Sequence, residues 1–308
     1  MNSMEKKLSI GKTGRHETFT PRYGWIKKGY EKAKNNPHVF KDANDIEQLG
    51  VGKNMVRSIR YWCSVFGILE PSSQGKQGDM TPTDFGDFLL DDVNGHDPFL
   101  EDLATLWLLH WKLFRVPYNA VSWPLAFSFC NMPSFDQQQF TDGIVAAASR
   151  IGNGRLSKIS TSSYAKDASC ILRMYTPNDG SQNEIRCPFE QLELIFTGQE
   201  PRTFFFSLSD KHTLPPLIFL ACCFDYADFI LPHNLRSLSL SRITYEPASP
   251  GVAFKLSETH CGEKIDQAAK EIKGVTFVES NGIRQLQYEL SAGELFWECL
   301  KQYYQQST

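Results

Sequence analysis

Apolar positions between residues 42 and 90 repeat with the spacing of helices, followed by that of a short hairpin. In residues 42–49 the apolar side chains fall on one helical face, and a glycine-rich turn follows at residues 50–52. Residues 53–66 carry apolar side chains every three or four positions, which predicts a second amphipathic helix. Helix, glycine turn and helix in this order are typical of a helix-turn-helix.

The segment after this helix pair predicts a wing. Residues 67–69 and the segment that begins at Met80 indicate two short strands around a Gly/Ser/Gln/Lys stretch at residues 72–78. A helix capped by Thr81 or Thr83 follows. This order of elements is that of a winged helix-turn-helix.

The rest of the chain predicts more helices and a second hairpin. The expected helices are 99–114, with Asp97 as its cap and Pro98 at its first position, 135–151, 164–175, a buried one at 214–229, 258–272 and 292–304, capped by Ser291. Pro250-Gly251 indicates a turn. Asn281-Gly282 predicts the tip of a hairpin with strands at 275–279 and 283–290.

These patterns together predict a mainly α fold with short β-hairpins, in the α+β class. We expect a basic arm and a winged helix-turn-helix DNA-binding domain over residues 1–93. A helical middle domain should follow over residues 94–199. Residues 200–308 should form a C-terminal winged-helix-like α+β domain, because they repeat the order of the first unit without repeating its residues.

Charge is distributed unevenly along the chain. The formal net charge is -3, but residues 1–70 hold 13 Lys or Arg against 7 Asp or Glu, and the remainder holds 19 against 28. Residues 11–30 mix glycine, basic and aromatic side chains and predict an ordered arm that becomes helical only near Tyr23. A basic front end on an acidic body suits local contact with phosphates.

Composition and missing motifs narrow the class of protein further. Hydrophobic residues make up 41% of the 308, so the chain should fold rather than stay disordered. No secretory signal or membrane span is apparent, and eight scattered cysteines without a C-x-x-C pair favour a reduced, cytoplasmic setting. Phosphate-binding loop, dinucleotide, H-E-x-x-H and G-x-S-x-G motifs are absent, which leaves nucleotide hydrolysis and serine hydrolysis without support.

The predicted second helix carries the most specific candidate surface. Lys53, Asn54, Arg57 and Arg60 are spaced so that three or four of them can face one DNA groove, and Arg suits guanine or phosphate while Asn suits adenine. The arm adds further DNA-binding candidates, namely Arg15, Arg22, Lys27 and Lys28. The alternative is a solvated basic face on a domain that contacts only proteins.

Two groups of residues are candidates for chemistry. His16 and Glu17, beside Arg15, could activate water at a phosphodiester, although His16 bonded to backbone and Glu17 paired with Arg15 or Arg22 is the simpler structural interpretation. A second group could hold Mg²⁺, but solvated helix ends explain most of it; its members are Asp84, Asp87, Asp91, Asp92, His96, Asp97, Glu101 and Asp102. Isolated histidines such as His110 are expected to be structural.

Several strings of residues resemble a known family. They are His16–Phe19, Pro21–Tyr30, Leu49–Val56, Ile59–Trp62 and, more loosely, Ser249–Gly251 with Phe254–Leu256. Over about its first 90 residues the chain resembles the domain-of-unknown-function proteins of bacterial DNA phosphorothioation loci, a group that includes the DNA-nicking component of an Ssp defence system. Arg15 stands where this resemblance leads us to expect glycine.

The resemblance implies an antiviral role in which one DNA strand is nicked so that sulfur can replace a phosphate oxygen. It implies a metal-dependent endonuclease using Mg²⁺ or Mn²⁺, but it does not indicate the catalytic residues. His16 and Glu17 are the candidates because they lie in the matched arm and have usable chemistry. Expected partners are double-stranded DNA, a cysteine desulfurase, a reductase-like ATP pyrophosphatase, an ATPase and a second copy of the chain in a homodimer. The alternative is a non-catalytic DNA-binding adaptor that recruits the modification enzymes.

Overall fold

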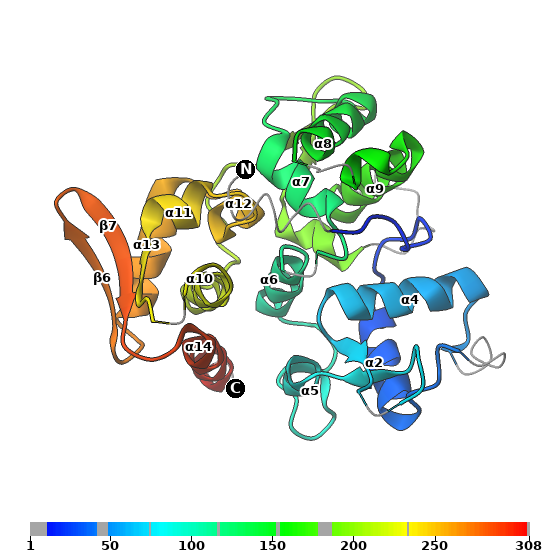
Figure 1. Cartoon of the computed structure of the whole chain (residues 1–308), viewed down its shortest axis with the longest axis horizontal. Coiled ribbons are helices and arrows are strands. Elements are labelled where there is room, and N and C mark those ends of the chain that lie inside the picture. Colours follow the sequence, from blue (N-terminus) through cyan, green and yellow to red (C-terminus); the bar gives the residue numbers. More distant parts are fainter. Residues whose placement is uncertain are drawn as a thin grey trace.

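The computed structural model of the chain describes residues 11–41, 49–73, 75–115, 118–151, 155–177, 187–232 and 234–306. It confirms the predicted α+β class, because helices dominate and the described strands form small antiparallel sheets of two or three strands. Figure 1 shows three groups of elements around the central helix α6: the N-terminal group, the middle helices and the C-terminal group with its long hairpin. The bounds of the three domains remain predictions.

The N-terminal group packs two helices against a short hairpin and a third helix. Its elements are α2 (Trp25–Asn35), α4 (Lys53–Val65), β1 (Leu69–Pro71), β2 (Met80–Pro82) and α5 (Asp84–Leu90). The hydroxyl of Thr83 accepts a hydrogen bond from Gly86 N, so the predicted cap is confirmed. The helix expected at residues 42–49 falls on residues 42–48, outside the described part, and the winged helix-turn-helix therefore stays a prediction.

The buried face of α4 is the one that the apolar spacing predicts. Val56, Ile59, Trp62, Cys63 and Phe66 are almost fully buried. Their side chains pack with α2 into the common core, and the exposed residues of the helix are Lys53, Asn54 and Arg57 in its first half.

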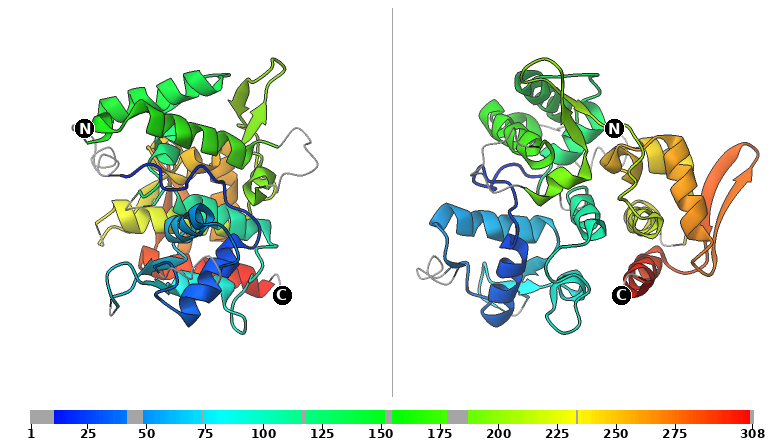
Figure 2. Two further views of the ribbon diagram at one scale, coloured as in Figure 1. Left: turned by 90° about the vertical axis from the view of Figure 1, so that its right-hand side faces the viewer. Right: turned by 180° about the vertical axis from the view of Figure 1, so that it is seen from behind.

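The middle helices surround α6, which is buried on nearly all sides. The elements here are α6 (Leu103–Lys112), α7 (Ser122–Phe129), α8 (Gln137–Ile151), η1 (Leu156–Lys158), α9 (Thr161–Tyr175), η2 (Pro188–Leu192), β3 (Ile195–Thr197) and β4 (Phe204–Phe206). Figure 2 shows α8 and α9 side by side at one end of the molecule. The helices expected at 135–151 and 164–175 are confirmed with small shifts of their ends.

The start predicted for the helix at residues 99–114 was wrong. The helix α6 begins at Leu103 and is capped by Asp102, whose carboxylate accepts a hydrogen bond from Ala104 N. Leu100 has a φ of 57°, in the left-handed region, and this interrupts the helical backbone that was expected to start at Pro98. Asp97 instead accepts hydrogen bonds from the N–H groups of Glu101 and Asp102 and organises the turn.

The C-terminal group combines a helical layer with a three-stranded sheet in the order β5-β7-β6. Its elements are α10 (Pro216–Ile230), β5 (Ser237–Ser239), α11 (Leu240–Tyr245), α12 (Pro250–Phe254), α13 (Glu258–Ala269), β6 (Val275–Ser280), β7 (Ile283–Tyr288) and α14 (Ala292–Gln306). Asn281 and Gly282 have φ of 52° and 75°, as a tight hairpin turn requires, so this prediction is confirmed. The turn expected at Pro250-Gly251 was wrong, because Ser249 caps a short helix there.

The cysteines and the apolar helix α10 are buried, as the sequence predicts. All eight cysteines are buried and unpaired, as expected of small core residues. The apolar run at residues 214–231 is the buried helix α10, as predicted. Within the described residues, none of the helices has the length and hydropathy needed to cross a bilayer.

Candidate nucleic-acid interface

The first half of α4 presents an exposed and uncompensated basic surface. Lys53, Asn54 and Arg57 are all exposed, and none of them forms an ion pair with another described residue. Lys53 and Arg57 are four residues apart, so two like charges lie next to each other at the positive end of the helix dipole. This arrangement costs the helix a few tenths of a kcal/mol and concentrates positive potential where a phosphate would relieve it.

Arg60, predicted on the same face, turns toward the segment between β1 and β2 instead. Its Nη2 donates to the carbonyl of Gly78 at 2.9 Å, in the segment between β1 and β2. This segment is held further by the buried carboxylate of Asp79, which accepts hydrogen bonds from Lys41 Nζ at 2.6 Å and His38 Nδ1 at 2.7 Å. Burial alone would raise the pKa of Asp79, but these two partners, together with a hydrogen bond from Lys76 N, outweigh it and lower the pKa to about 2.

The predicted basic residues of the arm differ in how far they are available to a ligand. Lys27 is buried, and its ammonium donates to the carbonyl of Leu90 and pairs with Asp92. Lys28 is partly buried and donates to the carbonyl of Leu49. Arg22 is partly buried, with its guanidinium over the ring of Trp25 at 5.1 Å. Arg15 is exposed, so of these four it is the most accessible to a phosphate.

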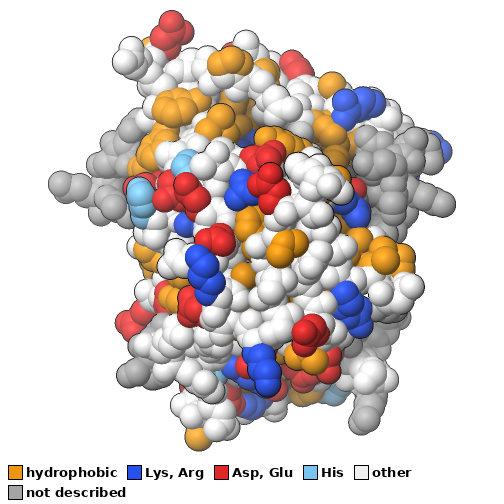
Figure 3. Space-filling view, turned by 90° about the vertical axis from the view of Figure 1, so that its left-hand side faces the viewer, with side chains coloured by type: hydrophobic (Ala, Val, Ile, Leu, Met, Phe, Trp, Pro, Cys, Tyr) orange, Lys and Arg blue, Asp and Glu red, His pale blue; other side chains and the backbone are white. Residues whose placement is uncertain are grey.

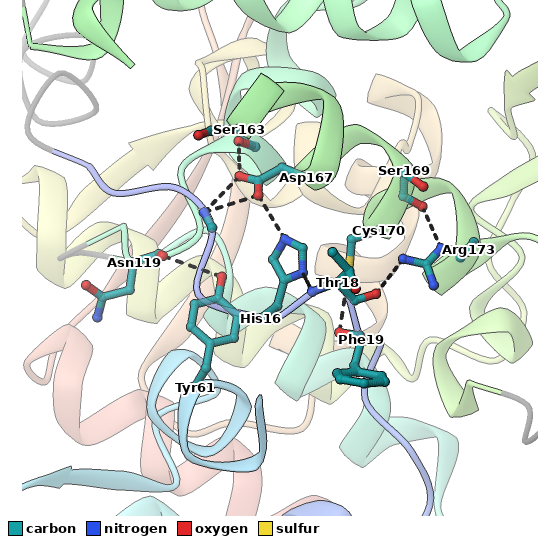
Figure 4. A network of polar contacts seen from close by, with 12 residues as sticks. His16, Thr18, Phe19, Tyr61, Asn119, Ser163, Asp167, Ser169, Cys170 and Arg173 are labelled. Atoms are coloured by element: carbon teal, nitrogen blue, oxygen red, sulfur yellow. Dashed lines mark hydrogen bonds and ion pairs between the residues drawn. The ribbon is translucent and has the colours of Figure 1, made fainter. Parts of the chain in front are cut away.

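His16 lies inside the molecule and both of its ring nitrogens are occupied. Its Nδ1 accepts a hydrogen bond from Thr18 N at 3.1 Å, so the ring proton is on Nε2, which donates to Asp167 Oδ1 at 2.8 Å. Figure 4 shows the arm passing between α4, which supplies Tyr61, and α9, which supplies Asp167. With 1% of its surface exposed, His16 has the surroundings of a structural side chain.

Asp167 is the centre of this network. Its buried carboxylate accepts hydrogen bonds from Gly14 N at 3.1 Å and from the Ser122 hydroxyl at 2.6 Å, in addition to His16. The arm is therefore tied to α7 and α9 through one side chain. The sequence offered a signal for this residue, because an acid at position 167 falls on the apolar face of the helix predicted for residues 164–175.

The backbone of the arm is strained around His16. Gly14, Arg15, Glu17 and Thr18 all have positive φ, between 50° and 74°. The value of 74° at Arg15 explains why glycine was expected there, since only glycine adopts this region without cost. Glu17 is partly exposed and forms no ion pair with Arg15, Arg22 or any other described residue.

The acidic residues considered for Mg²⁺ do not form a metal centre. Within the described part of the chain, no group of three or more His, Cys, Asp or Glu lies close enough together to hold an ion. Several of the carboxylates have structural partners: Asp87 accepts from the Tyr30 hydroxyl, Asp91 pairs with Lys34, and Asp102 caps α6. Among the described residues these acids therefore do not form a cluster of metal ligands.

Comparison with known proteins gives a family and two similar structures. Residues 14–304 match the family described as a protein of unknown function (DUF4007). A crystal structure of SspB is 31% identical, with a TM-score of 0.88, and the match covers 97% of this chain and 90% of that one. A magnesium ion-bound SspB crystal structure is 32% identical, with the same TM-score and coverage. No curated protein matches the chain.

Proposed function

Because the chain belongs to the DUF4007 family and is SspB-like in structure over nearly all of its length, we propose that it is a DNA-binding component of a bacterial DNA phosphorothioation system. In this role it meets double-stranded DNA and the enzymes of sulfur modification: a cysteine desulfurase, a reductase-like ATP pyrophosphatase and an ATPase. The structural similarity to SspB supports the assignment to a phosphorothioation system. The contact with DNA is argued from this chain's own residues.

The exposed face of α4 is the observation that carries the proposal. Lys53 and Arg57 are adjacent, solvent-facing and without acidic partners, and Asn54 beside them can pair with a base edge. The wing that Arg60 and Asp79 hold lies next to this helix, an arrangement in which a helix and a hairpin reach DNA together. We expect Lys53 and Arg57 to contact phosphates or guanines.

Reversing both charges tests the DNA contact. We expect Lys53→Glu with Arg57→Glu to weaken duplex binding at least about 100-fold, because two charge-assisted contacts contribute about 1.5–3 kcal/mol each. The slope of log K against log salt should fall by about two. The measurement is fluorescence anisotropy of a labelled duplex at several salt concentrations, with circular dichroism to verify the fold.

A matched control replaces two lysines by glutamate in the C-terminal group, away from α4. On the face formed by the C-terminal group, acidic, basic and apolar side chains are intermixed (Figure 3). Lys270 follows α13 and pairs with Asp266, and Lys301 lies on α14. Both are exposed, and changing both to glutamate should leave DNA affinity nearly unchanged. Equal losses in the two double variants would mean that only net charge matters, and the α4 assignment would be discarded.

A second candidate function is nicking of one DNA strand. One relative is described as magnesium ion-bound, which favours testing Mg²⁺ and Mn²⁺ with this chain. Glu17 is the candidate general base, since its carboxylate is partly exposed and unpaired among the described residues, beside the exposed Arg15. His16 would position the arm rather than exchange protons with a substrate, because both ring nitrogens are bonded internally.

A plasmid assay distinguishes a nickase from an adaptor. If the chain nicks DNA by itself, supercoiled plasmid should become open circles with Mg²⁺ or Mn²⁺ but not with EDTA, and Glu17→Ala should lower the rate at least about 100-fold. Glu263→Ala, an exposed acid on α13, is the control and should cleave normally. Cleavage that survives Glu17→Ala would reject this residue, and binding without cleavage would favour the adaptor.

A further inference from the structure

A cavity of about 220 Å³ lies where the N-terminal group meets the central helix. Its wall is formed by the ends of α4 and α6 and by the segment after α6, and it includes Ser64, Gly67, Lys112, Arg115 and Asn119. One water molecule needs only about 10–15 Å³ of such space. The cavity therefore has room for a ligand of several atoms.

Two cations line the cavity, and only one of them has an acidic partner. Arg115 Nε pairs with Asp225 Oδ2 at 2.7 Å, and the same oxygen accepts from Trp111 Nε1. Arg115 Nη1 is buried without a hydrogen-bond partner among the described residues. Lys112 forms no ion pair with any described carboxylate, because Asp225 is engaged by Arg115 and Trp111.

Lys112 is held in place by aromatic rings. Its Nζ lies 4.3 Å from the ring centroid of Phe85 and 4.8 Å from that of Phe296. The rings stabilise the cation but do not replace the oxygen acceptors that three N–H groups require. Burial accordingly lowers the pKa of Lys112, and the more distant charge of Asp225 compensates only in part.

We propose that this cavity binds a phosphate group, either free phosphate or the terminal phosphate of a nucleic-acid strand. A phosphate would supply acceptors to Lys112 and to the unpartnered Nη1 of Arg115 at once, with Ser64 and Asn119 as neutral donors. The site is separate from the proposed DNA contact, because the basic face of α4 lies at the opposite end of that helix.

Phosphate binding can be measured directly on the whole protein. Titration calorimetry with inorganic phosphate at constant ionic strength should show saturable binding, and Lys112→Met should weaken it at least about 10-fold. Lys166→Met, on the exposed face of α9, should bind like the unaltered protein. A 5′-phosphorylated oligonucleotide that displaces phosphate better than its unphosphorylated form would identify a strand end as the ligand. Displacement by neither form would identify free phosphate, and equal displacement by both would reject the terminal phosphate as the group recognised.

Two outcomes would overturn the proposal. One is the absence of saturable binding to the unaltered protein at millimolar phosphate, and the other is unchanged affinity in a folded Lys112→Met variant. If that variant does not fold, thermal unfolding of the unaltered protein tests the proposal instead. Phosphate must then raise the midpoint of thermal unfolding saturably at low millimolar concentrations, where its general salting-out effect is small, whereas chloride at equal ionic strength must not. Equal midpoints would reject the site.

Discussion

Replacing Asp167 with alanine is expected to lower the free energy of unfolding by about 3–5 kcal/mol. The carboxylate is fully buried and accepts hydrogen bonds from His16, Ser122 and Gly14 N. Alanine would leave these three donors buried without a partner, and each unsatisfied donor carries a desolvation cost. Urea unfolding followed by tryptophan fluorescence measures the loss.

The same variant should also release the arm from α7 and α9. Trypsin cleaves after basic residues, and Lys12 and Arg15 lie in the segment that Asp167 holds, so cleavage there should become faster. Asp142→Ala, which removes an exposed acid from α8, is the matched control and should change stability by less than about 0.5 kcal/mol. A stable Asp167→Ala protein with an uncleaved arm would show that the network does not anchor it.

The second large effect is expected on acidification and arises from His110. This side chain is fully buried, with Nε2 donating to the carbonyl of Ala253 at 2.8 Å and Nδ1 accepting from the Tyr175 hydroxyl at 2.7 Å. The predicted structural role of His110 is thereby confirmed. Burial lowers the pKa of His110 from 6.5 to about 3.

The sign of the pH dependence follows from this lowered pKa. Below pH 6.5 the unfolded chain takes up a proton at His110, whereas the folded protein does so only near pH 3. Stability from this group is therefore complete above pH 6.5 and decreases as the pH falls toward 3. At pH 4 the loss should be about 3 kcal/mol.

The matched variant is His110→Gln, which keeps one donor and one acceptor but cannot titrate. Denaturant unfolding of both proteins at a series of pH values between 7 and 4 isolates the histidine, because all other titrating groups are shared. The difference in unfolding free energy between the two proteins should shrink by about 3 kcal/mol over this range. A difference that stays constant with pH would show that His110 is not responsible.

Local patterns of the sequence were sufficient for most of the fold. The apolar spacing at Val56, Ile59 and Trp62 identified the buried face of α4, and its polar positions Lys53 and Arg57 are exposed as expected. Caps and turns were also readable, because Thr83 and Asn281-Gly282 act through bonds and dihedral angles only a few residues apart. Such features depend on neighbours in the chain.

The candidate site was less predictable, because its partners are distant in sequence. His16 and Asp167 are 151 residues apart, and nothing near His16 indicates that a carboxylate would occupy its Nε2. Lys27 was grouped with exposed cations, but α5 ends beside it and supplies the carbonyl of Leu90, 63 residues away. The helix α7 was not predicted at all, since its nearly uniform burial leaves no amphipathic period.

The position of the arm has a consequence for the order in which the chain can fold during synthesis. Lys12 exchanges backbone hydrogen bonds with Tyr118 and Val121, and Gly14 and His16 need the carboxylate of Asp167. These partners leave the ribosome more than 100 residues after the arm, and ribosomes add roughly 5–20 residues per second. For several seconds, therefore, the arm has no place to dock, and its final conformation is fixed only by residues made much later.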